Sequence, residues 1–422
     1  MVRLNPIRVL ATPSPTRAAA AMGHGQFGIA LHQRGTADVA GLGAALAESV
    51  MGLPQTPSAV AWDFLSIALA VFAADRFVVR NQFADAWTRT ISLEVELADP
   101  AAWSGLEASL EATLRFLTSD IWYIRFRPGG LPPPPVPAKP TDRDCACLFS
   151  GGLDSLIGAL DAKKNKRKPL LVSQASPKEG GPQRSLAARI GLEAHRFEGK
   201  ASEKWQAPYE PSSRARSILF LGYGAVVAST LSATAPVDLL VPENGLISIN
   251  APLTLRHVGS LSTRTTHPHF ISSLQAIFDG VGLNARMTNP YGFATKGEML
   301  KNCKDRDVEK IAADSYSCGK GKRLNQHCGR CVPCLIRRAS FHAAGLHDDT
   351  KYHVDDLSNQ ALYADVAATR IAAANVKSAD LARWVSAAGP LPHDAPSRSA
   401  YTSVVRRGTI ELAKFFQTVH WA

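Results

Sequence analysis

A short glycine-containing segment, residues 150–155, combines the residue types that bind phosphate. It reads Ser-Gly-Gly-Leu-Asp-Ser and follows an apolar run at 145–149, with a helical pattern from Leu156 onward. Two glycines let the backbone turn tightly around an anion, and a helix N-terminus directs free N–H groups at it. An aspartate beside phosphate suits a magnesium ion or a hydrogen-bonding role. We interpret the segment as a pyrophosphate cradle made by Ser150, Gly151, Gly152, Asp154 and Ser155.

The alternative interpretation of this segment is an ordinary Ser-Gly-Gly turn whose aspartate caps the helix. The strand–loop–helix context favours the cradle. The sequence has no G-x-x-x-x-G-K-[ST] motif, which disfavours transfer of a γ-phosphoryl group. On these residues the segment resembles the PP-loop of the ATP pyrophosphatase superfamily. That resemblance implies ATP with Mg²⁺ as cofactors, attack on the α-phosphate, and release of pyrophosphate.

Four of the seven cysteines lie close together, at a spacing that suits one metal ion. Residues 328–334 read Cys-Gly-Arg-Cys-Val-Pro-Cys, and the fourth cysteine precedes them along the chain. Four thiolates without a water position describe a closed, tetrahedral structural zinc site. An iron–sulfur cluster is the alternative to zinc. His327 is a candidate to replace one sulfur as a ligand, but its position next to Cys328 favours a flanking role. The predicted Zn²⁺ ligands are Cys318, Cys328, Cys331 and Cys334.

The two motifs together are more specific than either motif alone. A PP-loop followed by Cys-Gly-x-Cys-x-x-Cys and then by Leu-x-Arg-Arg at 335–338 resembles QueC, the 7-cyano-7-deazaguanine synthase family. The resemblance runs from about Cys145 to Leu346. It implies an ATP-dependent C–N ligase whose substrate is a deazapurine similar to 7-carboxy-7-deazaguanine.

Four further residues are candidates for contacts with ATP or with the substrate. Arg214 and Arg216 stand in the first turn of a predicted helix, 213–230, where positive charge opposes the helix dipole. We interpret them as phosphate or carboxylate contacts, with an exposed first turn as the alternative. Glu243 and Asn244 follow the next predicted strand, and ligands of doubly wound sheets bind beyond the carboxyl ends of strands. They are candidates for recognising a purine edge, with an Asn-Gly turn as the alternative.

Later residues complete the predicted site. Arg264, Thr266 and His267 are placed in the same pocket, with a surface loop as the alternative. Lys296 follows Thr295 in a Thr-Lys-Gly-Glu sequence typical of a capping box. QueC-like sequences have a threonine–lysine pair at this point, which implies contact between Lys296 and an ATP phosphate. The predicted catalytic residues are Asp154, Ser155 and Lys296.

Short apolar strands alternate with helices after residue 143, and these elements must position the site. The alternation predicts an α/β fold with a doubly wound parallel sheet, and the PP-loop resemblance implies its adenine nucleotide alpha hydrolase-like form. A proline-rich stretch cannot form a helix or a central strand, so we expect a linker before the sheet. The predicted domains are 1–127, an α+β accessory domain; 128–142, the linker; 143–346, the catalytic domain with the zinc site; and 347–422, a helical extension.

The composition is that of a globular protein with excess positive charge. Of 422 residues, 45% are hydrophobic and 20% are charged. Lys plus Arg outnumber Asp plus Glu by 47 to 36, a net charge of +11, which indicates an anionic partner. Nucleic acid remains open as a partner, although no interleaved aromatic residues support it. We expect no membrane span, no secretory signal and a cytoplasmic location.

The regions outside the QueC-like part extend the resemblance. Pro-Glu-Asn-Gly at 242–245, the stretch 262–268, the long N-terminal region and the C-terminal helices are similar to QatC, the QueC-like subunit of Qat anti-phage defence systems. That resemblance implies a partner protein from the same operon, whose amine replaces ammonia as the nucleophile. Two other functions stay open as alternatives: a tRNA-thiolating, adenylate-forming enzyme, and a non-catalytic nucleotide-binding subunit.

Overall fold

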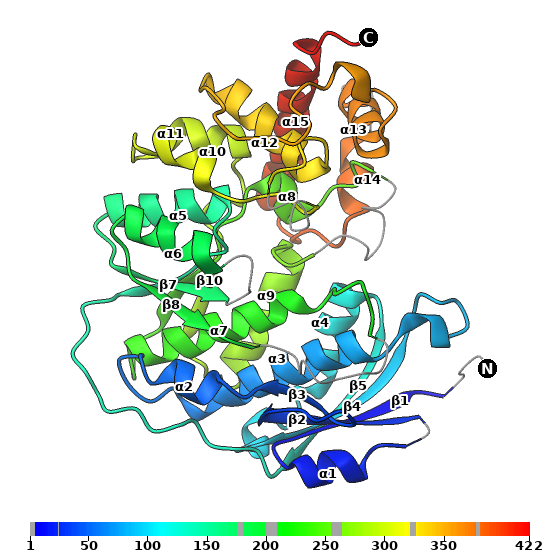
Figure 1. Ribbon diagram of the computed structural model, residues 1–422, viewed down its shortest axis with the longest axis vertical. Helices are drawn as coiled ribbons and strands as arrows, with labels where there is room; N and C mark the ends of the chain where they lie inside the picture. The colour runs from blue at the N-terminus through cyan, green and yellow to red at the C-terminus, as the bar shows by residue number, and fades with distance from the viewer. Residues whose placement is uncertain are drawn as a thin grey trace.

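Two five-stranded β-sheets, each accompanied by helices, form the framework of the protein (Figure 1). All strand pairs of these two sheets among the described residues are parallel. Parallel sheets need helices on their faces, which explains the buried, apolar strands and confirms the predicted α/β fold. The computed structural model describes residues 5–23, 25–174, 180–199, 209–254, 264–320, 326–376 and 380–422.

The first sheet is built from the N-terminal region and has the strand order β3-β2-β1-β4-β5. Its strands are β1 (Ile7–Thr12), β2 (Gln26–Gln33), β3 (Ala40–Gly43), β4 (Thr90–Leu97) and β5 (Ile121–Pro128). The accompanying helices are α1 (Pro15–Ala20), α2 (Leu46–Val50), α3 (Ala59–Phe77) and α4 (Glu107–Thr118).

This N-terminal region differs from the α+β arrangement expected from the sequence. The five described strands all pair in parallel, and α4 connects β4 to β5. Antiparallel neighbours need only a tight turn, whereas parallel neighbours need a crossover such as this helix. Because its strands are parallel and joined by a helix, the region is an α/β layer. Alternation of apolar residues locates a strand but does not give the direction of its neighbour, so the sequence did not reveal this arrangement.

The second sheet follows and has the strand order β10-β9-β6-β7-β8. Its strands are β6 (Cys145–Leu148), β7 (Pro169–Gln174), β8 (Ala194–Phe197), β9 (Val237–Leu240) and β10 (Ala285–Thr288). The helices of this part are α5 (Leu153–Lys164), α6 (Gly180–Arg189), α7 (Arg216–Leu231), α8 (Gly245–Ile249), α9 (Pro268–Gly280) and α10 (Lys296–Asn302). All four residues of β6 are buried, as expected for a central strand.

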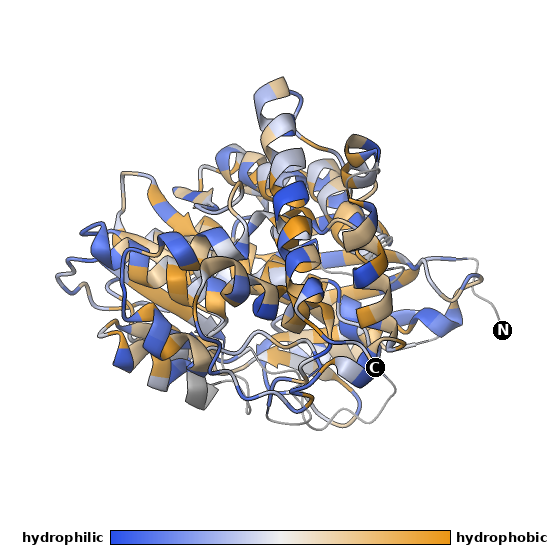
Figure 2. Ribbon diagram, turned by 90° about the horizontal axis from the view of Figure 1, so that it is seen from above, coloured by the Kyte–Doolittle hydropathy of each residue, from blue (hydrophilic) through white to orange (hydrophobic). Residues whose placement is uncertain are grey.

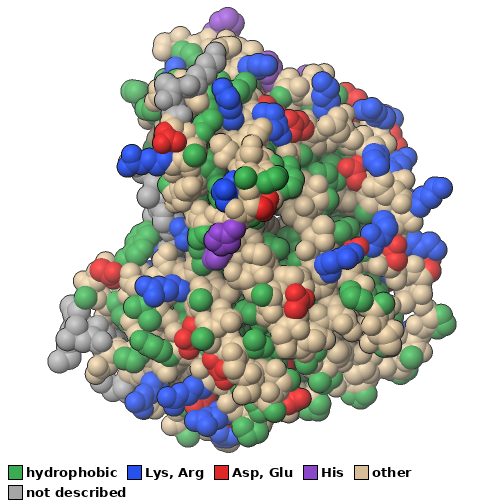
Figure 3. Space-filling model, turned by 180° about the vertical axis from the view of Figure 1, so that it is seen from behind, with side chains coloured by type: hydrophobic (Ala, Val, Ile, Leu, Met, Phe, Trp, Pro, Cys, Tyr) green, Lys and Arg blue, Asp and Glu red, His purple; other side chains and the backbone are tan. Residues whose placement is uncertain are grey.

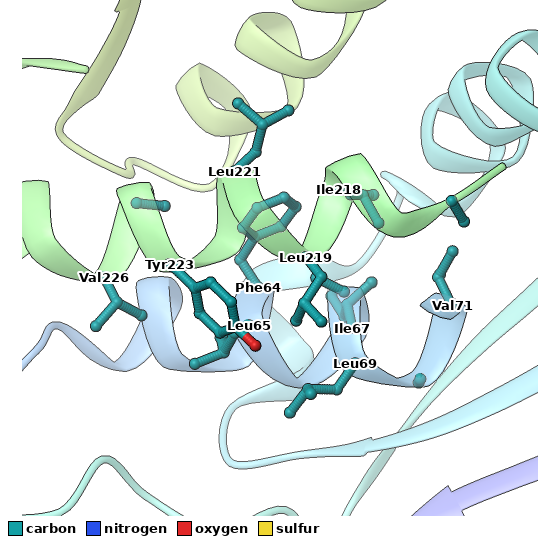
Figure 4. Packing of buried hydrophobic residues seen from close by; sticks show 14 of the residues in the cluster. Phe64, Leu65, Ile67, Leu69, Val71, Ile218, Leu219, Leu221, Tyr223 and Val226 are labelled. Carbon is teal, nitrogen blue, oxygen red and sulfur yellow. The ribbon is translucent and has the colours of Figure 1, made fainter. Parts of the chain in front are cut away.

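Helices α3 and α7 pack against each other between the two sheets (Figure 4). Every residue of α3 from 61 to 71 is buried, so this helix is apolar on nearly all sides. Phe64 and Leu65 of α3 and Leu219 and Tyr223 of α7 belong to one core cluster that includes residues of both sheets. The two sheets are therefore stabilised by a shared hydrophobic core. The division of the chain at 128–142 remains a prediction.

The C-terminal part is helical. Its helices are α11 (Val308–Ile311), α12 (Val332–Ala344), α13 (Ala364–Asn375), α14 (Leu381–Ser386) and α15 (Ala395–Gln417). Helices α12 and α15 pack against α10 (Figure 1). Buried residues of α8, α12, α13, α14 and α15 form a separate hydrophobic cluster. Hydrophobic and hydrophilic residues alternate along the helices (Figure 2). Within 347–422, the described residues include the helices α13, α14 and α15.

On the face of the molecule that Figure 3 shows, the charged side chains are not gathered in one place. Lys and Arg side chains lie on several parts of the face shown in Figure 3, mixed with Asp and Glu. Among the described helices, none combines the length and apolar character that crossing a bilayer requires.

Candidate functional site

The predicted phosphate loop lies where the strand order of the second sheet reverses. β6 is the central strand: the chain adds β7 and β8 on one side of it and then returns to place β9 on the other side. The segments after β6 and β9 therefore leave the same edge of the sheet as neighbours. Ligands of open α/β sheets bind at such a switch point, beyond the carboxyl ends of the strands.

The phosphate loop is held in a tight turn that ends at the N-terminus of α5. Gly151 has φ of +79°, a left-handed conformation that strains any residue with a side chain. Gln183 Nε2 donates to the Ser150 carbonyl at 3.0 Å, and the Ser155 hydroxyl donates to the Gly152 carbonyl at 2.9 Å. Ser150 is exposed, whereas Ser155 is buried. The turn thus opens toward solvent at its first residue and is anchored at its last.

Asp154 is the centre of a buried polar cluster that joins three segments of the chain. Lys296 Nζ lies 2.6 Å from Asp154 Oδ1. The side-chain and backbone nitrogens of Asn244 donate to Asp154 Oδ2 at 2.7 and 3.2 Å. Asp154, Asn244 and Lys296 are 6%, 0% and 4% exposed. The structure therefore brings together residues that the sequence analysis selected from positions 154, 244 and 296.

The cluster shifts the pKa values of its two carboxyl groups, Asp154 and Glu243, in opposite directions. Burial alone would raise the pKa of Asp154, but the positive charge of Lys296 and hydrogen bonds from Glu243, Lys296 and Asn244 bring it below its ordinary value. Burial raises the pKa of Glu243 well above its ordinary value, and the neighbouring Asp154 carboxylate raises it further. Two carboxyl groups so close cannot both ionise cheaply. The pKa of Glu243 therefore lies above that of Asp154, so Glu243 is the carboxyl group of the pair that takes up a proton first as the pH falls.

Local structure places each partner of Asp154. Thr295 caps α10 through a complete capping box with Glu298, which confirms the predicted box and puts Lys296 at the first helical position. Asn244 caps α8, since its side chain accepts from Ile247 N at 3.1 Å. Asn289, directly after β10, hydrogen-bonds both the N–H and the carbonyl of Glu243. Two helix N-termini and one strand end therefore converge on Asp154.

The four predicted metal ligands form a compact cluster of buried sulfurs. Their Sγ atoms all lie within 4.8 Å of one another. The distance is 3.7 Å between Cys318 and Cys331 and 3.9 Å between Cys328 and Cys334. A tetrahedral zinc ion with Zn–S bonds of about 2.3 Å places its sulfurs about 3.8 Å apart. An iron–sulfur cluster distributes its four thiolates over two or four irons and spreads the sulfurs further, so the geometry suggests zinc.

The metal cluster is connected to the phosphate loop by the residues that precede Cys318. Tyr316 N donates to the Gly151 carbonyl at 2.7 Å, and Leu153 N donates to the Ser317 hydroxyl at 3.2 Å. His327 Nε2 accepts from Ser317 N at 3.2 Å, so this histidine supports the segment beside the cluster. A zinc ion at the four sulfurs would therefore fix the backbone that contacts the loop.

The two arginines predicted for the first turn of a helix have different surroundings, and because α7 begins at Arg216, Arg214 precedes the helix. Arg214 is buried, stacks over Trp87 at 4.4 Å and donates to the Thr118 carbonyl at 2.8 Å. These contacts place its guanidinium against the N-terminal region, because burying it requires acceptors that this region supplies. Arg216 is half-buried, and its Nε lies 3.5 Å from the Gln174 side chain at the carboxyl end of β7. Of the two, Arg216 is at the edge of the sheet where the phosphate loop lies.

Of the last three predicted substrate residues, Arg264 and His267 contact the same aromatic ring, and Thr266 lies elsewhere. Arg264 stacks over Phe116 at 4.7 Å, and the buried ring of His267 also lies against Phe116. Burial lowers the pKa of His267 to about 3, so it is neutral. Thr266 instead lines a cavity of about 720 Å³ that Asn289 and Met287 also line, beside the Glu243 segment. Within the described contacts, only Thr266 adjoins the surroundings of Asp154.

Sequence reasoning missed the residues of other elements that support the phosphate loop, the Glu243 segment or the capping box that presents Lys296. They are Gln183, Asn289, Tyr316, Ser317, and Arg407 and Glu411 on α15. Two of them had an indirect signal in the sequence: Asn289 follows a strand, and Ser317 precedes a metal ligand. Gln183 and the α15 residues had none, because only tertiary packing brings them to the site.

Comparisons with known proteins agree with this geometry. Residues 265–345, which include Lys296 and the cysteine cluster, match the family described as Queuosine biosynthesis protein QueC. A 7-cyano-7-deazaguanine synthase from Novosphingobium aromaticivorans is 26% identical over 52% of this chain and 97% of its own length.

Higher identity is confined to shorter segments. The synthase of Paracoccus denitrificans is 36% identical over 22% of this chain and 40% of its own length. That of Rhizobium etli is 40% identical over 21% of this chain and 37% of its own length. In these two relatives the match spans about two fifths of the protein. The matched segments, the switch-point loop and the four-cysteine cluster together support a QueC-like protein of the PP-loop superfamily.

Proposed function

We propose that this protein is a QueC-like, ATP-dependent ligase that adenylates a carboxylate on a deazapurine similar to 7-carboxy-7-deazaguanine. The observation that carries the proposal is the position of the Ser-Gly-Gly-Leu-Asp-Ser loop, residues 150–155, at the switch point of the second sheet, with Lys296 beside Asp154. Similarity to 7-cyano-7-deazaguanine synthases supplies the substrate class.

The proposed reaction has two steps. A carboxylate oxygen of the deazapurine attacks the α-phosphorus of ATP, and the bond to the bridging oxygen breaks to release pyrophosphate. An amine nitrogen then attacks the activated carbonyl carbon, AMP leaves with the bonding electron pair, and the amine gives up a proton. With ammonia the product is an amide, and a second adenylation of the amide oxygen followed by loss of AMP gives a nitrile.

The residues around the loop have distinct proposed roles. Backbone N–H groups at the start of α5 and the hydroxyls of Ser150 and Ser155 bind pyrophosphate. Lys296 balances negative charge that develops on the phosphates. Asp154, whose pKa is held below its ordinary value, is the carboxylate available to a magnesium ion, which would neutralise phosphate charge when bound. Thr266 and the cavity beside the Glu243 segment are proposed to receive the deazapurine.

The tRNA-thiolating alternative requires a reactive thiolate near the phosphate loop. The two cysteines nearest in sequence, Cys145 and Cys147, are fully buried in β6. Burial raises the pKa of Cys145 to about 12, with a smaller contribution from a hydrogen bond to Asp144. A thiol of this kind is a poor nucleophile at neutral pH. The ligase is therefore the function that the described residues favour.

The identity of the amine is the finer part of the proposal. The QatC-like N-terminal and C-terminal regions favour an amine on a partner protein of an anti-phage defence operon. The product would be a partner carrying a covalently attached deazapurine. Mass spectrometry of co-expressed partners tests this step, and a partner that gains no mass with ATP and the deazapurine would restrict the nucleophile to ammonia.

The experiment that tests the proposed function separates AMP from ADP. The purified protein is incubated with magnesium and ATP, with or without 7-carboxy-7-deazaguanine, and the nucleotides are resolved by chromatography. We expect AMP and pyrophosphate only when the deazapurine is present. ATP binding without AMP would indicate the non-catalytic alternative, and AMP formation stimulated only by tRNA would indicate the thiolation alternative.

A further inference from the structure

The long C-terminal helix α15 makes polar contacts with the capping box that presents Lys296. Arg407 Nε lies 2.6 Å from Glu298 Oε1, and its Nη2 donates to the Phe293 carbonyl at 2.7 Å. Glu411 accepts a short hydrogen bond from the Thr295 hydroxyl and another from the Gly297 backbone. The helix therefore binds both capping residues of α10.

Close packing at Gly297 shows how tightly the two helices meet. A Cβ atom at Gly297 would lie 2.6 Å from Glu411 Oε1 and 2.9 Å from the side chain of Ala343 on α12. Such distances leave no room for a side chain at this position. The first turn of α10 is thus fixed between α12 and α15.

The same face of α15 packs against α8, which begins at Asn244. A Cβ atom at Gly245 would lie 2.7 Å from Val404, and one at Gly408 would lie 2.9 Å from Leu246. Val404, Gly408 and Glu411 lie on one face, because residues three and four apart are neighbours on a helix. One helix face therefore contacts both segments that supply partners to Asp154.

We propose that α15 is a positioning element of the nucleotide site: through Glu411 and Arg407 it fixes Lys296, and through Val404 and Gly408 it fixes Asn244, around the Asp154 carboxylate. This inference rests on the proposed function, because it assigns the effect to binding of magnesium-ATP. A purely structural role for α15 would cover the hydrophobic cluster without depending on the polar contacts to the capping box.

The first test measures the position of α10 without nucleotide. Hydrogen exchange of the amides of residues 295–299 is compared in the unaltered protein, Glu411→Ala and Arg407→Met. Lys414→Gln is the matched control, because Lys414 is exposed on the same helix and this substitution also changes the net charge by one unit. We expect exchange at 295–299 to rise about tenfold in the first two variants and to stay unchanged in the control. Unchanged exchange in Glu411→Ala and Arg407→Met overturns the proposal.

The second test is a double-mutant cycle on the dissociation constant of magnesium-ATP, measured by calorimetry. We expect Glu411→Ala to raise this constant about tenfold and Glu411→Gln, which keeps an acceptor oxygen, to raise it less than about threefold. In a Lys296→Met background, Glu411→Ala should change it less than about twofold, because the residue that it positions is gone. A tenfold change in that background overturns the proposal.

The two proposals fail in distinguishable ways. If the unaltered protein binds magnesium-ATP and releases AMP, but the Glu411 and Arg407 variants bind it equally well, only the role of α15 is overturned. If the unaltered protein binds no magnesium-ATP, the proposed function fails and the effect assigned to α15 fails with it, whatever the exchange experiment shows.

Discussion

The two sheets of the molecule have the same strand order but different residues where that order reverses. Numbered from its own first strand, each sheet runs 3-2-1-4-5, with the first strand in the centre. Each therefore has a switch point between its first and fourth strands, the usual location of a ligand in such folds. In the second sheet a glycine-containing loop occupies this point, with Asp154 and Lys296 beneath it.

In the first sheet the corresponding position is filled by the protein's own side chains. Thr12, at the end of β1, donates to Glu96 Oε2 at 2.6 Å, and Arg17 lies 2.6 Å from Glu96 Oε1. Glu96 is 2% exposed. Gly130 N donates to the Leu97 carbonyl at 3.0 Å, so the chain leaving β5 passes the end of β4.

The comparison teaches that strand order provides a location and residues decide whether it can bind a ligand. After β1 the chain reads Pro-Ser-Pro and starts the short helix α1, whereas after β6 it reads Ser-Gly-Gly and starts α5. The first sequence offers prolines without N–H groups; the second offers a flexible turn and free donors. The N-terminal sheet thus contributes to the core through α3, and the second sheet carries the site.

The largest expected effect comes from removing the cation that distinguishes the second switch point. Lys296→Met should lower the rate of AMP formation about a thousandfold, roughly 4 kcal/mol, because a preorganised positive charge at the phosphates is lost. The measurement is AMP release at saturating ATP. Lys301→Met, on the exposed side of the same helix, is the control, and an equal loss in both variants would contradict the role of Lys296.

Loss of the metal should weaken the second switch point and leave the first unaffected. Cys334→Ser is expected to cost roughly 3 to 4 kcal/mol of stability and to raise the dissociation constant of magnesium-ATP, because Tyr316 and Ser317 would no longer be fixed against the loop. Zinc content, thermal unfolding and ATP calorimetry are measured together. A zinc-free variant with unchanged ATP affinity would show that the cluster and the loop are independent.

A pH-dependent effect is expected at α15. Burial raises the pKa of Glu411 to about 7, and the negative charge of Glu298 acts in the same direction. Hydrogen bonds from Thr295 and Gly297 and the positive charge of Arg407 oppose this increase. The pKa of Glu411 in the folded state exceeds its ordinary value of 4.5. The contribution of protonated Glu411 to the free energy of unfolding is therefore complete below pH 4.5 and is lost as the pH rises through about 7. Glu411→Gln should remove a loss of up to about 3 kcal/mol.

Urea unfolding at pH 4, 6 and 8 measures this effect. The difference in unfolding free energy between Glu411→Gln and the unaltered protein should shift in favour of the variant as the pH rises. A difference that stays constant across these three pH values would show that Glu411 does not titrate in this range.

The smallest expected effect lies in the first sheet. Glu96→Gln should cost about 1 to 2 kcal/mol of stability, because the substitution replaces the buried carboxylate by a neutral amide and removes the ion pair with the half-exposed Arg17. AMP formation should stay within about twofold of the unaltered rate. Thermal unfolding and the AMP assay test this together, and a large loss of AMP formation would show that the two switch points are functionally connected.

Parts of the site followed from local sequence patterns. The Ser-Gly-Gly-Leu-Asp-Ser loop, the capping box at Thr295 and the cysteine spacing are each set by residues close along the chain. Such patterns are recognisable because the turn, the cap and the metal site each need particular residue types at fixed offsets. Arg214 had an equally clear local signal and lies elsewhere, since its burial against Trp87 depends on a distant segment.

The sequence by itself determined the alternation of strands and helices after residue 143 and the Ser-Gly-Gly-Leu-Asp-Ser and four-cysteine motifs, and it selected Asp154, Asn244 and Lys296 as candidates. Only the tertiary structure decided that these three residues share one buried cluster, that the N-terminal strands are all parallel, and that α15 contacts the capping box. The physical reason is that periodicity and capping act over a few residues. Strand direction depends instead on pairing with other segments, and the contact of Glu411 with Thr295 joins residues 116 positions apart.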